Sequence, residues 1–204
     1  MPSQMTTANK ITITRILMIP LFVMLAIYYG QGVQKGEPRE WERWAAIAVF
    51  ALAAISDGLD GFIARRYNQR TQLGVILDPL ADKGLLLSGI LTLSFSNWHY
   101  AFPIWFPVLV IARDVVVVAG ALLLHYVNGK VHVRPSWLGK VATFLQMLAI
   151  AAVMLQLPYT HPFFGHNVLL LDALVYLAGL FTFLSGVGYV LNGIRQLHVA
   201  GTGQ

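Results

Sequence analysis

Residues 57–82 read DGLDGFIARRYNQRTQLGVILDPLAD and place four aspartates in otherwise apolar sequence. Asp57 and Asp60 are three residues apart, and Asp78 and Asp82 are four apart. Residues at these separations share one face of a helix, so each pair can direct two carboxylates toward one point. The stretch therefore predicts two consecutive helices, joined by a short connection, whose four carboxylates converge.

Four converging carboxylates repel one another unless a positive charge lies between them. Placing a charge in a bilayer also costs at least about 2.5 kcal/mol, so each aspartate needs a partner. The alternative explanation of the four aspartates is that they form interhelical ion pairs that hold the helices together. Carboxylate oxygens are the ligands that Mg²⁺ and Mn²⁺ prefer, and the stretch has no His or Cys to suit zinc. Gly58, Gly61 and Gly74 leave room for a ligand, and Arg65 suits a phosphate. This combination is typical of metal-assisted phosphoryl transfer.

The composition around this stretch is that of a membrane protein. Of 204 residues, 57% are hydrophobic and 11% are charged, and the mean hydropathy is +0.65. A soluble domain carries about 25% charged residues, so a soluble globular enzyme and a disordered chain are both excluded. The net charge of +5 comes from scattered residues, which argues against nucleic acid as a partner. The absence of cysteine excludes disulfides and thiolate chemistry.

Six segments are long and apolar enough to span a bilayer, which takes about 20 residues. They run over Ile11–Gly30, Arg43–Ala64, Leu73–Phe95, Ala101–Val127, Trp137–Leu157 and Val168–Leu191. The predicted fold class is therefore all-α: a polytopic membrane protein with six transmembrane helices. We expect a single membrane domain over residues 1–204, with membrane lipids as its surroundings.

Basic residues give the orientation, because they are enriched in cytoplasmic connections. They gather at the N-terminal end of the chain, in the connection between spans 2 and 3, at the connection between spans 4 and 5, and after span 6: Lys10, Arg15, Arg65, Arg66, Arg70, Lys130, Arg134, Lys140 and Arg195. The connection between spans 1 and 2 is the exception, and its basic residues are offset by Glu37, Glu40 and Glu42. We expect both termini and the aspartate cluster on the cytoplasmic side. The lack of an organellar targeting segment favours a bacterial inner membrane.

The aspartate stretch resembles the signature of the CDP-alcohol phosphatidyltransferases, D-x-x-D-G-x-x-A-R-x8-G-x3-D-x3-D, at every defining position. The six-span layout and the opening NKITITR of residues 9–15 are similar to that family as well. The resemblance implies that an acceptor hydroxyl attacks the β-phosphorus of a CDP-linked lipid. CMP then leaves, and a phosphodiester forms.

The resemblance also implies roles for the motif residues. Asp57, Asp60, Asp78 and Asp82 would hold Mg²⁺ or Mn²⁺, and Asp82 would also be the general base on the acceptor hydroxyl. The residues that would border the CDP moiety of CDP-diacylglycerol are Asp57, Gly61, Ala64, Arg65 and Gly74.

The acceptor implied by this resemblance is glycerol 3-phosphate, used by members that make phosphatidylglycerol phosphate. Such an anion needs cations, and the candidates are Arg113, Arg134, Lys140 and Arg195. Residues 136–147, SWLGKVATFLQM, look like a segment of these members that usually reads G-K-x-K-T-x-x-Q. Ala142 stands where the second Lys is common.

Three alternatives remain open. Arg113-Asp114 and Arg134-Pro135-Ser136 are similar to cardiolipin synthases of the same superfamily, which use phosphatidylglycerol as acceptor. A cation- or proton-coupled transporter could use the aspartates as its ion site, although spans 4–6 hold no second aspartate pair. An inactive scaffold conflicts with the complete aspartate set.

Glycines in and just after the sixth span permit close helix contact. These glycines are Gly179, Gly186, Gly188 and Gly193. Together with the family resemblance, they suggest a homodimer.

Overall fold

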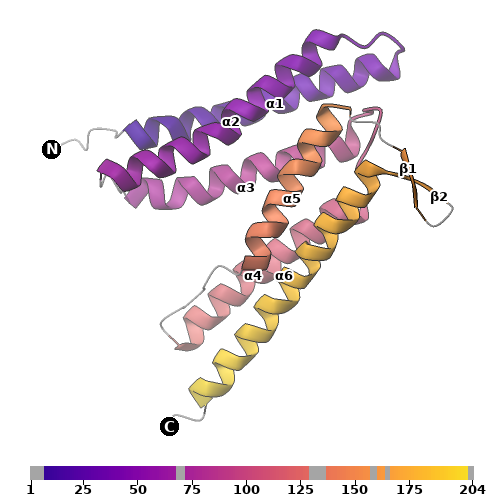
Figure 1. The fold of residues 1–204 in the computed structure, drawn as a ribbon. Coiled ribbons are helices and arrows are strands. Elements are labelled where there is room, and N and C mark those ends of the chain that lie inside the picture. Colours follow the sequence, from indigo (N-terminus) through magenta and orange to yellow (C-terminus); the bar gives the residue numbers. More distant parts are fainter. Residues whose placement is uncertain (1–6, 68–71, 129–136, 157–159, 164–165, 202–204) are drawn as a thin grey trace. The chain divides into compact units, whose positions relative to one another are not determined.

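The computed structural model describes residues 7–67, 72–128, 137–156, 160–163 and 166–201 (Figure 1). Side chains are described over these ranges except at residues 7–10, 57–67, 72–80, 124–125, 127–128, 160–163, 166–169 and 195–201. Within the described ranges, the chain forms six helices and one two-stranded hairpin. Two compact units result, namely Met1–Ala101 with Val153–Gln156, and Phe102–Ala152 with Leu157–Gln204. Each is described by itself.

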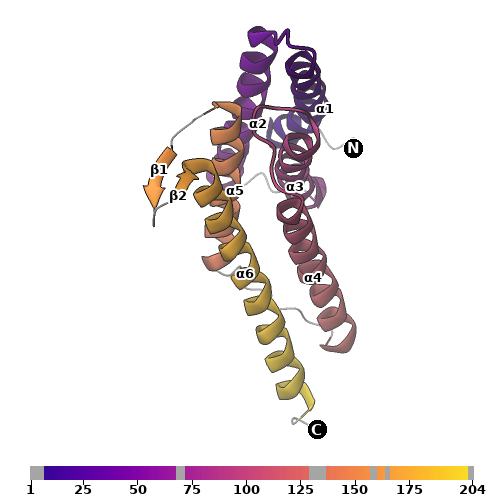
Figure 2. The same ribbon diagram turned by 90° about the vertical axis from the view of Figure 1, so that its right-hand side faces the viewer.

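The first unit is built from α1 (Thr7–Gln34), α2 (Glu40–Tyr67) and α3 (Gln72–Phe95). Helix α1 packs against both α2 and α3, and α2 also contacts α3 (Figures 1 and 2). Aromatic side chains fill the contacts: the rings of Phe22 and Phe50 lie 5.2 Å apart, and those of Tyr29 and Trp98 lie 4.6 Å apart. Trp98 Nε1 donates to the Ala26 carbonyl at 2.9 Å. The turn after α3 is thereby bound to α1.

The turn between α1 and α2 is set by a glycine and by ion pairs. Gly36 adopts a φ of 77°, a conformation that closes helices and favours glycine. On the following helix, Glu40 forms an ion pair with Arg43 at 2.7 Å and Glu42 forms one with Arg39 at 3.7 Å. Acidic residues in a first turn also suit the helix dipole. Two of the basic residues that depart from the expected charge distribution, Arg39 and Arg43, are therefore locally balanced.

One polar contact joins the residues after α5 to α1 within the first unit. Gln156 has a φ of 52°, which is uncommon for a residue other than glycine. Its Nε2 donates to the Tyr29 hydroxyl at 2.6 Å and lies 3.1 Å from Nδ1 of His99. These contacts stabilise the left-handed conformation.

The second unit contains α4 (Trp105–Asn128), most of α5 (Trp137–Met154), a hairpin of β1 (Thr160–Phe163) and β2 (His166–Leu169), and α6 (Leu170–Gly201). Helix α4 packs along α6 (Figure 2). Gly179 and Gly186 of α6 lie at this contact: a Cβ atom at these positions would be 2.7 Å from Trp105 and 3.4 Å from Arg113. Two of the four glycines noted in the sequence thus serve a contact within the chain.

The hairpin departs from the all-α expectation. Val168 was expected to begin the sixth span but lies in β2, paired with His161 of β1. Pro162 in β1 has no amide hydrogen to donate to a helix, which disfavours helical structure here. Helix α5 ends at Met154 rather than Leu157, and α6 begins at Leu170. The helix expected at Val168–Leu191 is therefore confirmed from Leu170 onward, and only its first two residues lie in β2 instead.

Among the described residues, four helical segments are long and apolar enough to cross a membrane: Ile11–Gln34, Trp105–Leu123, Trp137–Met154 and Leu170–Ile194. Large apolar side chains such as Leu17, Val115 and Leu180 are exposed on these helices, as lipid-facing surfaces require. These features are those of an integral membrane protein. Spans through α2 and α3 and the single domain over residues 1–204 stay predictions.

Candidate active site

The four motif aspartates lie on two adjacent helices. Asp57 and Asp60 belong to α2, and Asp78 and Asp82 belong to α3. The two helices run in opposite directions (Figure 1) and are in contact. With a rise of 1.5 Å per residue, Asp57 and Asp82 each lie about 15 Å from the joined ends of the helices, and Asp60 and Asp78 about 10 Å. The backbone therefore places the two pairs at matching levels.

Both helices continue through the whole motif, so its residues fall on single faces. On α2, Gly61, Ala64 and Arg65 follow Asp57 at separations of four, seven and eight residues. On α3, Gly74, Asp78 and Asp82 are spaced by four. These separations define one helical stripe in each case.

Asp82 is the one motif aspartate whose side chain is described. Its Oδ1 accepts a hydrogen bond from Arg15 Nη1 at 2.6 Å. The Asp82 side chain is 46% exposed, whereas Arg15 is completely buried. A charge-assisted contact of this length is among the stronger hydrogen bonds in proteins.

Arg15 reaches α3 because α1 and α3 approach closely. One turn after Arg15, the Cδ1 atom of Ile19 lies 3.1 Å from the position that a Cβ atom on Gly84 would occupy. Thr12, one turn before Arg15, is also buried. The sequence reading took Arg15 as an orientation signal and missed this contact. Its position inside an apolar segment was the available signal, since intramembrane charges pair with one another.

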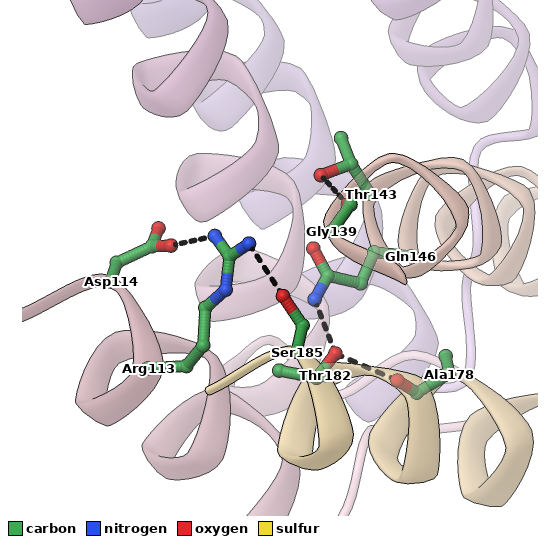
Figure 3. A network of polar contacts seen from close by, with 8 residues as sticks. All are labelled: Arg113, Asp114, Gly139, Thr143, Gln146, Ala178, Thr182 and Ser185. Atoms are coloured by element: carbon green, nitrogen blue, oxygen red, sulfur yellow. Dashed lines mark hydrogen bonds and ion pairs between the residues drawn. The ribbon is translucent and has the colours of Figure 1, made fainter. Parts of the chain in front are cut away.

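Arg113, an expected acceptor-binding residue, is engaged within the second unit (Figure 3). Its guanidinium donates to Asp114 Oδ1 at 2.8 Å and to Ser185 Oγ at 3.0 Å. It also lies over the ring of Tyr189, 5.4 Å from the centroid. With 12% of its side chain exposed, Arg113 links α4 to α6. Arg113 and Asp114 therefore form an ion pair within α4.

The other three candidate cations differ in what the structure describes. Lys140 lies in the first turn of α5, and its side chain is exposed. Arg195 lies in α6, with its side chain outside the described set. Arg134 lies outside the described residues. Lys140 is the described candidate most accessible to an anion.

The segment that follows Lys140 forms two kinds of polar contact (Figure 3). Thr143 donates to the Gly139 carbonyl of its own helix at 3.1 Å. Buried Gln146 donates through Nε2 to Thr182 of α6 at 2.7 Å, and the Thr182 hydroxyl donates to the Ala178 carbonyl at 2.7 Å. Gln146 thus fixes α5 against α6. Sequence similarity had noted this Gln without giving it a role.

A pocket of about 330 Å³ lies along α4 and α6 in the second unit. Its walls are mostly apolar side chains, including Leu109, Val116 and Phe183, with Arg113 at its edge. Among the described side chains, no group of three potential metal ligands occurs. The side chains of Asp57, Asp60 and Asp78 lie outside that set.

Comparison with known proteins places this geometry in context. The family model of CDP-alcohol phosphatidyltransferases matches residues 5–184. The chain is 35% identical over 191 residues to a probable phosphatidylglycerophosphate synthase of Mycobacterium tuberculosis strain H37Rv, covering 93% of the chain and 82% of that relative. It is 34% identical over 150 residues to the CDP-diacylglycerol–glycerol-3-phosphate 3-phosphatidyltransferase of Escherichia coli K12, covering 72% and 76%. An enzyme of the same name from Blochmanniella floridana is 35% identical over 149 residues, covering 72% of each chain.

Proposed function

Because this chain belongs to the CDP-alcohol phosphatidyltransferase family, we propose that it transfers the phosphatidyl group of CDP-diacylglycerol to glycerol 3-phosphate. The products are phosphatidylglycerol phosphate and CMP. The observation that carries this function is the relation to enzymes named for the reaction, over 72–93% of the chain. The motif aspartates at matching levels of α2 and α3 support it.

Asp57, Asp60, Asp78 and Asp82 would hold a divalent cation, Mg²⁺ or Mn²⁺. The donor set fits, since all four are carboxylates on two contacting helices and hard cations prefer oxygen ligands. When bound, such a cation would neutralise the diphosphate and stabilise CMP as it leaves.

The residues of the chain would perform the remaining chemistry. The acceptor hydroxyl attacks the β-phosphorus, its proton passes to a carboxylate oxygen of Asp82, and the bond to CMP breaks. The stripe of Gly61, Ala64 and Arg65 on α2, with Gly74 on α3, would border the CDP moiety beside Asp57. Small side chains admit the ligand, and the Arg65 guanidinium suits a phosphate.

The acceptor phosphate would be bound by basic residues from Arg113, Arg134, Lys140 and Arg195. Lys140 is the strongest described candidate because it is exposed at the start of α5. Arg113 is already engaged by Asp114 and Ser185, so a direct contact with the acceptor would require it to exchange partners.

Phosphatidylglycerol is the second candidate acceptor, which would make the enzyme a cardiolipin synthase. The Arg113–Asp114 pair favours this alternative because it is the feature shared with those enzymes. The relatives named above favour glycerol 3-phosphate. Each of them carries the name of a synthase or a transferase, so the transporter alternative finds no support among them.

We further propose that all six helices span a bacterial inner membrane, with both termini and the active site on the cytoplasmic side. The bacterial relatives and the basic residues of the predicted cytoplasmic connections support this orientation. A homodimer is part of the same proposal.

The test is CMP release by the purified protein in detergent with CDP-diacylglycerol and Mg²⁺ or Mn²⁺. Glycerol 3-phosphate, phosphatidylglycerol and inositol 1-phosphate are supplied in parallel, and Asp82→Asn is the inactive control. Release with glycerol 3-phosphate alone is expected. Release with phosphatidylglycerol alone would identify a cardiolipin synthase, and no release with any acceptor would refute the proposed reaction.

A further inference from the structure

Arg15 is the largest completely buried side chain of the described set. A guanidinium is rarely buried unless hydrogen bonds and an opposite charge compensate for the lost water. Here the compensating charge is the carboxylate of Asp82, 2.6 Å away on α3. Arg15 is thus paired with Asp82, the residue that the proposed function places at the reacting hydroxyl.

The two members of this pair differ in their access to a ligand. Arg15 is completely buried, whereas the Asp82 side chain is 46% exposed. A ligand of the site can therefore meet Asp82 but not the guanidinium behind it. Arg15 can therefore act on the reaction by orienting the Asp82 carboxylate, which it contacts directly.

Close packing of α1 against α3 fixes the position of Arg15 beside Asp82. Ile19 of α1 packs where Gly84 of α3 has no side chain, so the two helices meet closely beside the ion pair. Lys83, the residue after Asp82, lies about 100° around the helix and does not share its face. Arg15 therefore approaches Asp82 from a different helix, at a position set by packing.

We propose that Arg15 is a positioning residue of the active site, holding the Asp82 carboxylate in the orientation that accepts the proton of the acceptor hydroxyl. This inference rests on the proposed function. Mutation of a side chain that orients a metal-site ligand typically costs about 10–100-fold in metal affinity or activity.

The experiment compares kcat, KM and thermal stability of Arg15→Met and Arg15→Lys with the wild type in detergent. For Arg15→Met, kcat is expected to fall about 10–100-fold, as for other supporting residues, while the KM of both substrates stays within about threefold. Arg15→Lys is expected to recover part of the loss, because it keeps the charge without the planar fork. Rates are measured well below each unfolding temperature, where a purely structural role would leave kcat unchanged.

Arg43→Met is the matched control. Arg43 is also largely buried and paired with a carboxylate at 2.7 Å, but its partner is Glu40 on its own helix. Its kcat is expected to match the wild type. An equal loss in Arg43→Met, or a folded Arg15→Met with wild-type kcat, would overturn the inference.

If Arg15→Met does not fold, Arg15→Lys decides the question, with a kcat about tenfold lower expected and a wild-type kcat overturning the inference. Failure of the proposed function gives a different result, because the wild type itself would then release no CMP with any acceptor.

Discussion

The contact between Gly179 and Trp105 predicts that one added methyl group destabilises the second unit. A Cβ atom on Gly179 would lie 2.7 Å from Cζ3 and 2.9 Å from Cη2 of the Trp105 ring. The ring cannot yield easily, because it stacks on Tyr176 at 5.5 Å and meets the edge of Phe106 at 5.7 Å. Gly179→Ala must therefore shift either the indole or the α4–α6 contact.

The magnitude follows from two opposing effects. Overpacking of this kind costs about 1–3 kcal/mol, while replacing a helical glycine by alanine gains up to about 1 kcal/mol. The expected net result is a loss of about 0–2 kcal/mol, which is about 1–3 kcal/mol worse than an alanine that meets no neighbour. For a chain of this size, each kcal/mol lowers the unfolding temperature by about 2–4 °C. The measurement is thermal unfolding in detergent, followed by tryptophan fluorescence.

Gly188→Ala on the same helix is the matched control. Nothing lies within 4 Å of a Cβ atom at that position, so only the gain in helix propensity remains, and the unfolding temperature should stay level or rise. Replacing the indole by a smaller side chain, in Trp105→Leu, should remove most of the loss of stability caused by Gly179→Ala. Equal unfolding temperatures for the two glycine variants, or no relief by Trp105→Leu, would refute the reasoning.

Three further outcomes are expected. Trp98→Phe removes the hydrogen bond to the Ala26 carbonyl and part of a buried ring, and should lower stability by about 1–3 kcal/mol; an unchanged unfolding temperature would contradict that contact. Gln146→Leu removes the bond to Thr182 and should cost about 1 kcal/mol, with Thr143→Val as a control that loses no interhelical bond; equal losses would argue against the Gln146 contact. Chelation with EDTA should abolish CMP release, and added Mg²⁺ or Mn²⁺ should restore it; activity that survives exhaustive chelation would rule out the metal role.

Hydropathy predicted the helices well because long apolar segments have few other ways to satisfy their backbone in a membrane. The third segment, expected at Leu73–Phe95, is α3 at Gln72–Phe95. The predicted bounds are wrong where the apolar pattern no longer indicates whether the chain is helical. Helix α6 was expected to end at Leu191 but continues to Gly201, because a helix can extend into polar sequence. The hairpin before it was missed because hydropathy identifies long apolar segments and gives no signal for two strands of four residues each.

For the candidate site too, local sequence predicted some features and could not predict others. Spacing alone placed each aspartate pair on one helical face, since only local geometry is involved, and α2 and α3 confirm the helices. The partner of Asp82 lies 67 residues away in the sequence, and no local pattern carries that information. Arg113 illustrates the opposite case, since its partner Asp114 is its neighbour in the sequence.

That adjacency has a consequence for how the protein is made. Arg113 and Asp114 can neutralise each other as soon as α4 exists, before any later helix has been synthesised. The nascent helix α4 can thus enter the lipid with its two charges paired, at a lower free-energy cost than a lone arginine would incur. The bond from Arg113 to Ser185 must wait for α6. The Arg113–Asp114 ion pair can therefore form during synthesis, before α4 packs against α6.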